Sequence, residues 1–171
     1  MAWSTDRLRA SYESYAATVK HNTHLQKVAA CLQEVIRAEA GAYVGLVDCV
    51  YDGKIVQRES RLGDCRCVTC AKSLPWRGTG GMQGGHFVPG REASIVLEET
   101  NIAPQCTRCN KWLDGNRENY LIWMEHKHGK EEVERLTILR RKSVKQTREE
   151  LIEKRIELHH RLKAAMIVMG E

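Results

Sequence analysis

Two Cys-x-x-Cys motifs place the strongest constraint on how this chain of 171 residues folds. The first motif is Cys67–Cys70, and the second, Cys106–Cys109, is followed directly by Asn110. Four thiolates presented in two such pairs are the usual ligand set of a closed, tetrahedral structural zinc site. We therefore expect Cys67, Cys70, Cys106 and Cys109 to bind zinc and to hold together two segments that are distant in the sequence.

The other three cysteines are weaker candidates for the metal. Cys65 lies two residues before Cys67 and is an alternative ligand, but Cys67 has the more usual spacing to Cys70. Cys31 and Cys49 have mostly apolar neighbours, so we expect them to be ordinary core residues.

The start of the chain and its composition favour a cytoplasmic protein. Residues 1–6 contain no apolar stretch typical of a signal peptide, and no run approaches the roughly 18 apolar residues of a membrane span. In a reducing cytoplasm, Cys-x-x-Cys pairs bind metal more often than they form disulfides. The formal net charge of +5 is compatible with a polyanionic partner.

The hydrophobic pattern of the N-terminal part predicts two helices. They occupy residues 4–40 and are interrupted at 21–24. A capping box of Thr23 and Gln26 is expected to start the second helix, and Gly41 is expected to end it. The apolar positions that share one face of this helix are Leu25, Val28, Leu32 and Val35.

The sequence also predicts a β-hairpin and a further helix, as expected of an α+β protein. Residues 43–56 predict a β-hairpin whose turn is Asp52-Gly53. Residues 119–126 carry apolar side chains on one side and predict a helix that Gly129 closes.

The C-terminal part is expected to be helical and contains a basic cluster. Thr147 and Glu150 form a second capping box at the start of the last helix. The basic residues before or at this start are Arg140, Arg141, Lys142, Lys145 and Arg148. Such a cluster can neutralise phosphates. The interleaved glutamates are equally consistent with a solvated charged face, so both interpretations stay open.

Three polar residues between and after the cysteine pairs suggest phosphodiester chemistry. His86 follows two glycines, and a neutral imidazole can deprotonate water near neutral pH. The amide oxygen of Asn110 suits Mg²⁺, whereas thiolates do not. Asn101 is placed to tie a loop to the backbone. The alternatives are a loop histidine without a catalytic task and an asparagine that only caps a helix.

This segment resembles the HNH, or ββα-metal, endonucleases in their zinc-knuckle form, and more narrowly the phage NinG/Rap recombination proteins. Proteins of that group are structure-specific endonucleases acting on branched DNA such as Holliday junctions. The stretches that carry the resemblance are Cys67–Cys70, Gly85–Phe87, Asn101–Asn110, Asp114–Asn116, Tyr120 and Thr147–Leu151. The resemblance covers about residues 60–155.

The resemblance implies an α+β protein with a zinc-stapled HNH core at 61–128, between extensions at 1–60 (helical and hairpin, for packing or dimerisation) and 129–171 (helical and basic). It implies His86 as general base, Asn110 as a ligand of Mg²⁺ or Mn²⁺, and the four cysteines as zinc ligands. We favour Asn116 over Asp114 as a second magnesium ligand.

Two positions depart from the family pattern. Gly85 stands where many HNH enzymes have a metal-binding aspartate, although the NinG-like group also uses glycine there. Ala103 stands where many NinG-like sequences have histidine.

We therefore expect a DNA endonuclease for branched substrates in phage or prophage recombination, acting in the host cytoplasm as a homodimer. The alternatives are a duplex-cutting HNH endonuclease without junction preference and a non-catalytic zinc module that binds DNA. The expected phosphate contacts are Arg91, Arg108, Lys111 and Arg117. Trp76 and Trp112 are expected to fill the core rather than to stack on bases.

Overall fold

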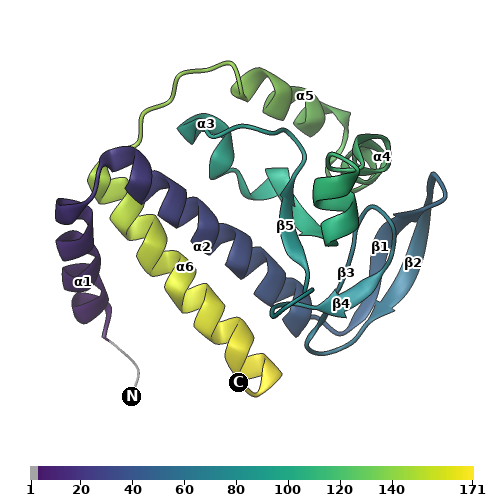
Figure 1. Ribbon diagram of the computed structural model, residues 1–171, viewed down its shortest axis with the longest axis horizontal. Helices are drawn as coiled ribbons and strands as arrows, with labels where there is room; N and C mark the ends of the chain where they lie inside the picture. The colour runs from purple at the N-terminus through teal and green to yellow at the C-terminus, as the bar shows by residue number, and fades with distance from the viewer. Residues whose placement is uncertain (1–3) are drawn as a thin grey trace.

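The computed structural model describes residues 4–171 and confirms an α+β protein with small antiparallel sheets (Figure 1). The helices are α1 (Thr5–Thr18), α2 (His21–Ala42), α3 (Ala93–Val96), α4 (Arg117–His128), α5 (Lys130–Leu139) and α6 (Arg148–Met169), with a 3₁₀ turn η1 (Glu99–Asn101) and a π-helical turn η2 (Arg108–Trp112). The strands are β1 (Gly45–Tyr51), β2 (Lys54–Ser60), β3 (Asp64–Arg66), β4 (Ser73–Pro75), β5 (Gln83–His86) and β6 (Ile102–Gln105). They pair as β1–β2, β3–β4 and β5–β6.

The two longest helices, α2 and α6, lie side by side between α1 and the strands (Figure 1). The apolar face predicted for α2 is buried. Its cluster comprises Leu25, Val28, Leu32 and Val35 from α2, Leu151 and Leu158 from α6, and Val96, Leu97 and Ile102 from the segment around β6. Each fully buried Leu or Val contributes roughly 1.5–3 kcal/mol. This core therefore fixes the β5–β6 hairpin against α2, and the expected extensions share a core with the central segment.

The break between the first two helices is not where the capping pattern predicts it. The helix α1 ends at Thr18 and α2 already begins at His21, so Thr23 lies inside the first turn of α2 and caps nothing. The cause is a contact from α6, because the Arg148 guanidinium donates to the carbonyl oxygens of Ala16 and Val19. Arg148 thereby ends α1.

Gly41 also differs from its expected role as a helix stop. It lies in the last turn of α2, which ends at Ala42. A Cβ at this position would lie only 2.8 Å from Cβ of Trp76. The glycine therefore permits close packing of α2 on the indole instead of ending the helix.

Three local signals are confirmed. The β1–β2 hairpin turns at Asp52 and Gly53, which both have positive φ, although β2 runs beyond the expected end to Ser60. Gly129 closes α4 with φ of 85°. Thr147 and Glu150 make both hydrogen bonds of the capping box at the start of α6. Within residues 4–171, every helix is too short or too polar to cross a bilayer.

Candidate metal centre and adjoining pocket

The four predicted cysteines form one cluster that could hold a zinc ion. The ligand atoms of Cys67, Cys70, Cys106 and Cys109 all lie within 4.8 Å of one another, and the Sγ atoms of Cys70 and Cys106 are 3.8 Å apart. Four Zn–S bonds of about 2.3 Å at tetrahedral angles put sulfur atoms about 3.8 Å apart, so the spacing fits. Cys65 is excluded as the alternative ligand, because its thiol lies in β3 and donates to the Arg37 carbonyl at 3.1 Å.

The cluster is surrounded by hydrogen-bond donors that suit thiolates. Hydrogen bonding with the Cys70 thiol, and then with Thr69, lowers the pKa of Cys67, whereas the pKa of Cys70 is raised because its thiol is the partner in that bond. Nδ2 of Asn116 lies 3.6 Å from Sγ of Cys109 and also donates to the Thr69 carbonyl at 3.0 Å. Gln105 donates to the Thr69 hydroxyl at 3.1 Å. The side-chain amide of Asn116 therefore contacts the cysteine cluster.

His86 ends strand β5, where it pairs in register with Ile102 of β6. Tyr120 of α4 fixes this strand by donating its hydroxyl to the Gly85 carbonyl at 2.9 Å. Any side chain at position 85 would collide with that of Gln105, which crosses the strand there. This collision gives a steric reason for glycine at position 85.

The imidazole of His86 is largely buried, and this burial lowers its pKa, with a partial offset from the Val96 backbone. Nε2 is buried and has no hydrogen-bond partner among residues 4–171. The side chain also lines a pocket. The ring is therefore uncharged near neutral pH.

Asn101 holds the loop that follows His86. Its Oδ1 accepts from Val88 N at 2.7 Å, and its Nδ2 donates to the Val88 carbonyl at 3.0 Å. Its own carbonyl accepts from Phe87 N at 2.9 Å. The side chain is fully buried, so Asn101 connects the two strands through a dry set of hydrogen bonds.

A small polar pocket of about 190 Å³ brings together residues from both sides of the second cysteine pair. Its lining is His86, Pro89, Gly90, Asn110, Asp114, Gly115 and Arg117. Asn110 does not cap a helix. Its Nδ2 donates to Oε1 of Gln83 at 2.8 Å, which leaves Oδ1 as the free atom of the amide. Asp114 is also held by Arg117, whose Nε lies 3.3 Å from Oδ2 of the carboxylate.

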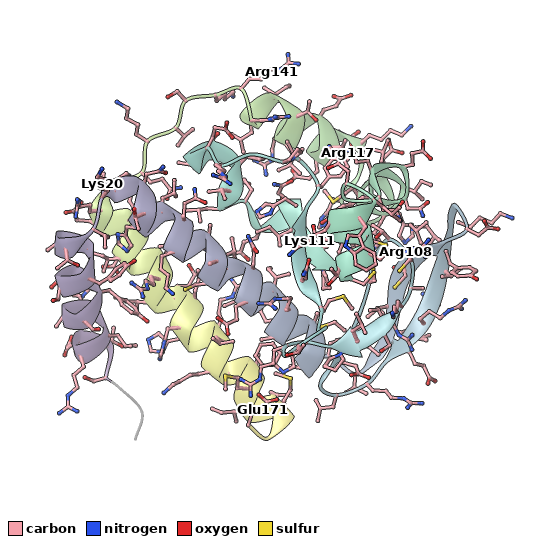
Figure 2. All side chains as sticks on the ribbon, in the orientation of Figure 1. Lys20, Arg108, Lys111, Arg117, Arg141 and Glu171 are labelled. Carbon is pink, nitrogen blue, oxygen red and sulfur yellow. The ribbon has the colours of Figure 1, made fainter. Side chains whose placement is uncertain are left out.

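The remaining predicted residues lie around this pocket rather than in it. Arg108 and Lys111 are exposed on η2, as Figure 2 shows, and Arg91 is exposed on the loop before α3. Trp76 is buried as expected, but Trp112 is 76% exposed, so its expected place in the core is wrong. The π-helical turn places its side chain in solvent while Cys109 is buried.

Two residues near the pocket carried no recognisable sequence signal of their role. Gln83 orients Asn110 from strand β5, and only the fold reveals their proximity. Gln105 reaches both Thr69 and the Gly115 carbonyl, the latter at 2.8 Å, and so links the cluster to the pocket wall.

Most of the chain matches a known protein family. Residues 39–167 match the family model described as bacteriophage lambda NinG protein. No curated protein and no solved structure matches the chain. The matched region begins near the end of α2 and includes the cysteine cluster, the polar pocket and nearly all of α6.

Proposed function

This chain belongs to the bacteriophage lambda NinG family, and from that premise we propose that it is a metal-dependent endonuclease acting on branched DNA. Family membership supports a phage recombination-related role. The observation that carries the nuclease proposal is the meeting of His86, Asn110, Asp114 and Arg117 in one polar pocket beside the cysteine cluster. The pocket combines a base, oxygen donors and a cation, the groups that phosphodiester hydrolysis uses.

In this proposal β5, β6 and η2 form a zinc-stapled ββα-metal core of the HNH type. The strand β5 carries His86, β6 leads directly into the second cysteine pair, and η2 carries Asn110. The backbone N of Val68 in the first cysteine pair donates to the Pro104 carbonyl in β6 at 3.0 Å. This arrangement supports a role for the cluster in fixing the hairpin that holds the catalytic base.

His86 is the proposed general base. Its burial keeps the ring neutral, and the imidazole takes the proton from the water that attacks phosphorus. General-base catalysis of this kind contributes typically 10²–10⁴-fold to a rate.

Asn110 and Asp114 are the proposed ligands of a catalytic Mg²⁺ or Mn²⁺. The amide oxygen of Asn110 is free, and the Asp114 carboxylate lines the same pocket. Such a cation, which keeps several waters, stabilises charge on the phosphoryl and leaving oxygens when bound. Asp114 is preferred here to the expected Asn116, because Asn116 uses its amide nitrogen beside Cys109.

The positive side chains around the pocket position the scissile strand. Arg117 lines the pocket itself, while Arg108 and Lys111 extend from the adjacent turn (Figure 2). Trp112 next to Lys111 offers an exposed aromatic face on which an unpaired base can stack, which supports a junction as the substrate. A Holliday junction has paired strands to cut, so a two-fold homodimer is the simplest assembly.

A nicking assay tests the function. The full-length protein is incubated with a labelled four-way junction and, separately, with its linear arms, in Mg²⁺, in Mn²⁺ and in EDTA. Metal-dependent cutting of the junction alone supports the proposal. Equal cutting of junction and arms indicates an endonuclease without junction preference, and binding without cutting in either metal indicates a non-catalytic DNA-binding module.

A further inference from the structure

A second groove, of about 330 Å³, adjoins the polar pocket. It lies between the loop after His86, helix α4 and the end of α5, and it shares Pro89 and Arg117 with the pocket. Its other positive residues are Arg140 and Arg141, which follow the last turn of α5. In Figure 2, Arg141 and Arg117 succeed one another toward Lys111. His86 and these arginines therefore line two pockets that meet at Pro89 and Arg117.

Arg140 and Arg141 differ from Arg117, which is paired with Asp114, and from the nearest arginine on α5. Arg135 of α5 is paired with Glu98 and Glu132, at 2.6 and 2.7 Å. Within residues 4–171, neither Arg140 nor Arg141 forms an ion pair or donates a side-chain hydrogen bond, and both are exposed.

The nearby glutamates do not neutralise the groove. Glu132 is held by Arg135, and Glu150 accepts from the Thr147 backbone in the capping box. The phosphate-binding interpretation of Arg140 and Arg141 is favoured, because no acidic residue of the described part of the chain lines the groove. Arg148 belongs neither to a phosphate-binding cluster nor to a solvated charged face, since its guanidinium donates to carbonyl oxygens at the end of α1.

We propose that this groove binds the sugar–phosphate backbone of the DNA strand next to the scissile phosphate, with Arg140 and Arg141 contacting its phosphates. This inference rests on the proposed nuclease function and adds the path of the substrate. Guanidinium groups bind phosphate oxygens in a bidentate manner. The apolar side chains of Phe87 and Leu121 line the groove between the arginines, where deoxyribose faces can pack.

The test compares two double variants of the full chain. Arg140→Gln/Arg141→Gln removes the groove charges, and Arg7→Gln/Lys20→Gln removes two exposed charges near α1, at the far end of the molecule (Lys20 in Figure 2). Binding to a fluorescent four-way junction is measured in Ca²⁺, over a series of salt concentrations. Each lost contact with duplex phosphate flattens the slope of log K against log salt by about 0.9, so the groove variant should lose about 1.8 and the control almost nothing.

Neutral methylphosphonate linkages then locate the contact. Placed in the strand beside the cut, they should weaken binding by the unaltered protein and have little further effect on the groove variant. Equal salt slopes for the two variants, or equal sensitivity to the neutral linkages, would overturn the groove assignment and leave the nuclease proposal intact. If the unaltered protein binds no DNA, both proposals fail.

Discussion

The cysteine cluster and the polar pocket share the same hairpin but are built in opposite ways. Three of the four cysteines are buried, and donors such as Asn116 surround the sulfur atoms. In the pocket, by contrast, the Asp114 side chain is 90% exposed and the amide oxygen of Asn110 is free. A closed site suits a metal that holds the fold, and an open site suits one that must meet a substrate. Stability and chemistry should therefore respond to different substitutions.

The largest effect is expected in the cysteine cluster. Cys106→Ser removes one of four thiolates, and structural zinc binding is worth roughly 10–16 kcal/mol in small peptides, as much as the whole stability of a typical domain. We expect this variant to lose zinc and to unfold, as measured by metal analysis and circular dichroism. The matched control is Cys65→Ser, which lies outside the cluster and should retain zinc. An unchanged zinc content in Cys106→Ser would remove the structural role of the cluster.

The second-largest effect is expected in the polar pocket. His86→Ala should lower the rate of junction cutting by about 10²–10⁴-fold, because the general base is lost. Zinc content should stay unchanged, although the loss of a largely buried ring should lower the melting temperature somewhat. Gel-based cleavage rates and metal analysis on the same preparation check this. Loss of zinc in His86→Ala would show that the two sites are not separable.

Asp114 and Asn116 test the boundary between the two sites. Asp114→Asn should raise the Mg²⁺ concentration needed for half-maximal cutting without changing zinc affinity. Asn116→Gly should weaken zinc binding by about 10–100-fold, as second-sphere changes do, without changing the Mg²⁺ requirement. Both substitutions tolerate the positive φ of these positions, which are 46° and 48°. The reverse pattern would place Asn116 in the catalytic site, as the sequence pattern favoured.

Features determined by neighbouring residues were predictable from the sequence. The cysteine spacing, the Asp52-Gly53 turn and the Thr147 capping box each act within a few residues, so their patterns identify them. The apolar face of α2 was also predictable, because apolar residues at helical spacing indicate which face of a helix is buried.

Features determined by distant contacts were not predictable. The end of α1 is contacted by Arg148, more than a hundred residues away, which donates to the carbonyl oxygens of Ala16 and Val19. The different surroundings of Asp114 and Asn116 also depend on a distant contact, because Asn116 donates to the Thr69 carbonyl, 47 residues earlier in the chain, and lies beside Cys109. Asp114 lines the pocket instead.

The smallest expected effect is a pH dependence of stability that arises from His86. Burial lowers the pKa of its imidazole in the folded protein below 6.5, the ordinary value that the unfolded chain retains. Between those two values the unfolded chain binds more protons, so the free energy of unfolding falls as the pH drops below 6.5 and is constant above it. His24 is shifted in the same direction by burial, then by Arg155. The contribution of His86 is therefore the difference between the unaltered protein and His86→Ala in urea unfolding at pH 7.5, 6.5 and 5.5. The unaltered protein should lose more stability on acidification than the variant, and parallel losses would mean that the folded protein leaves the His86 ring as hydrated as the unfolded chain does.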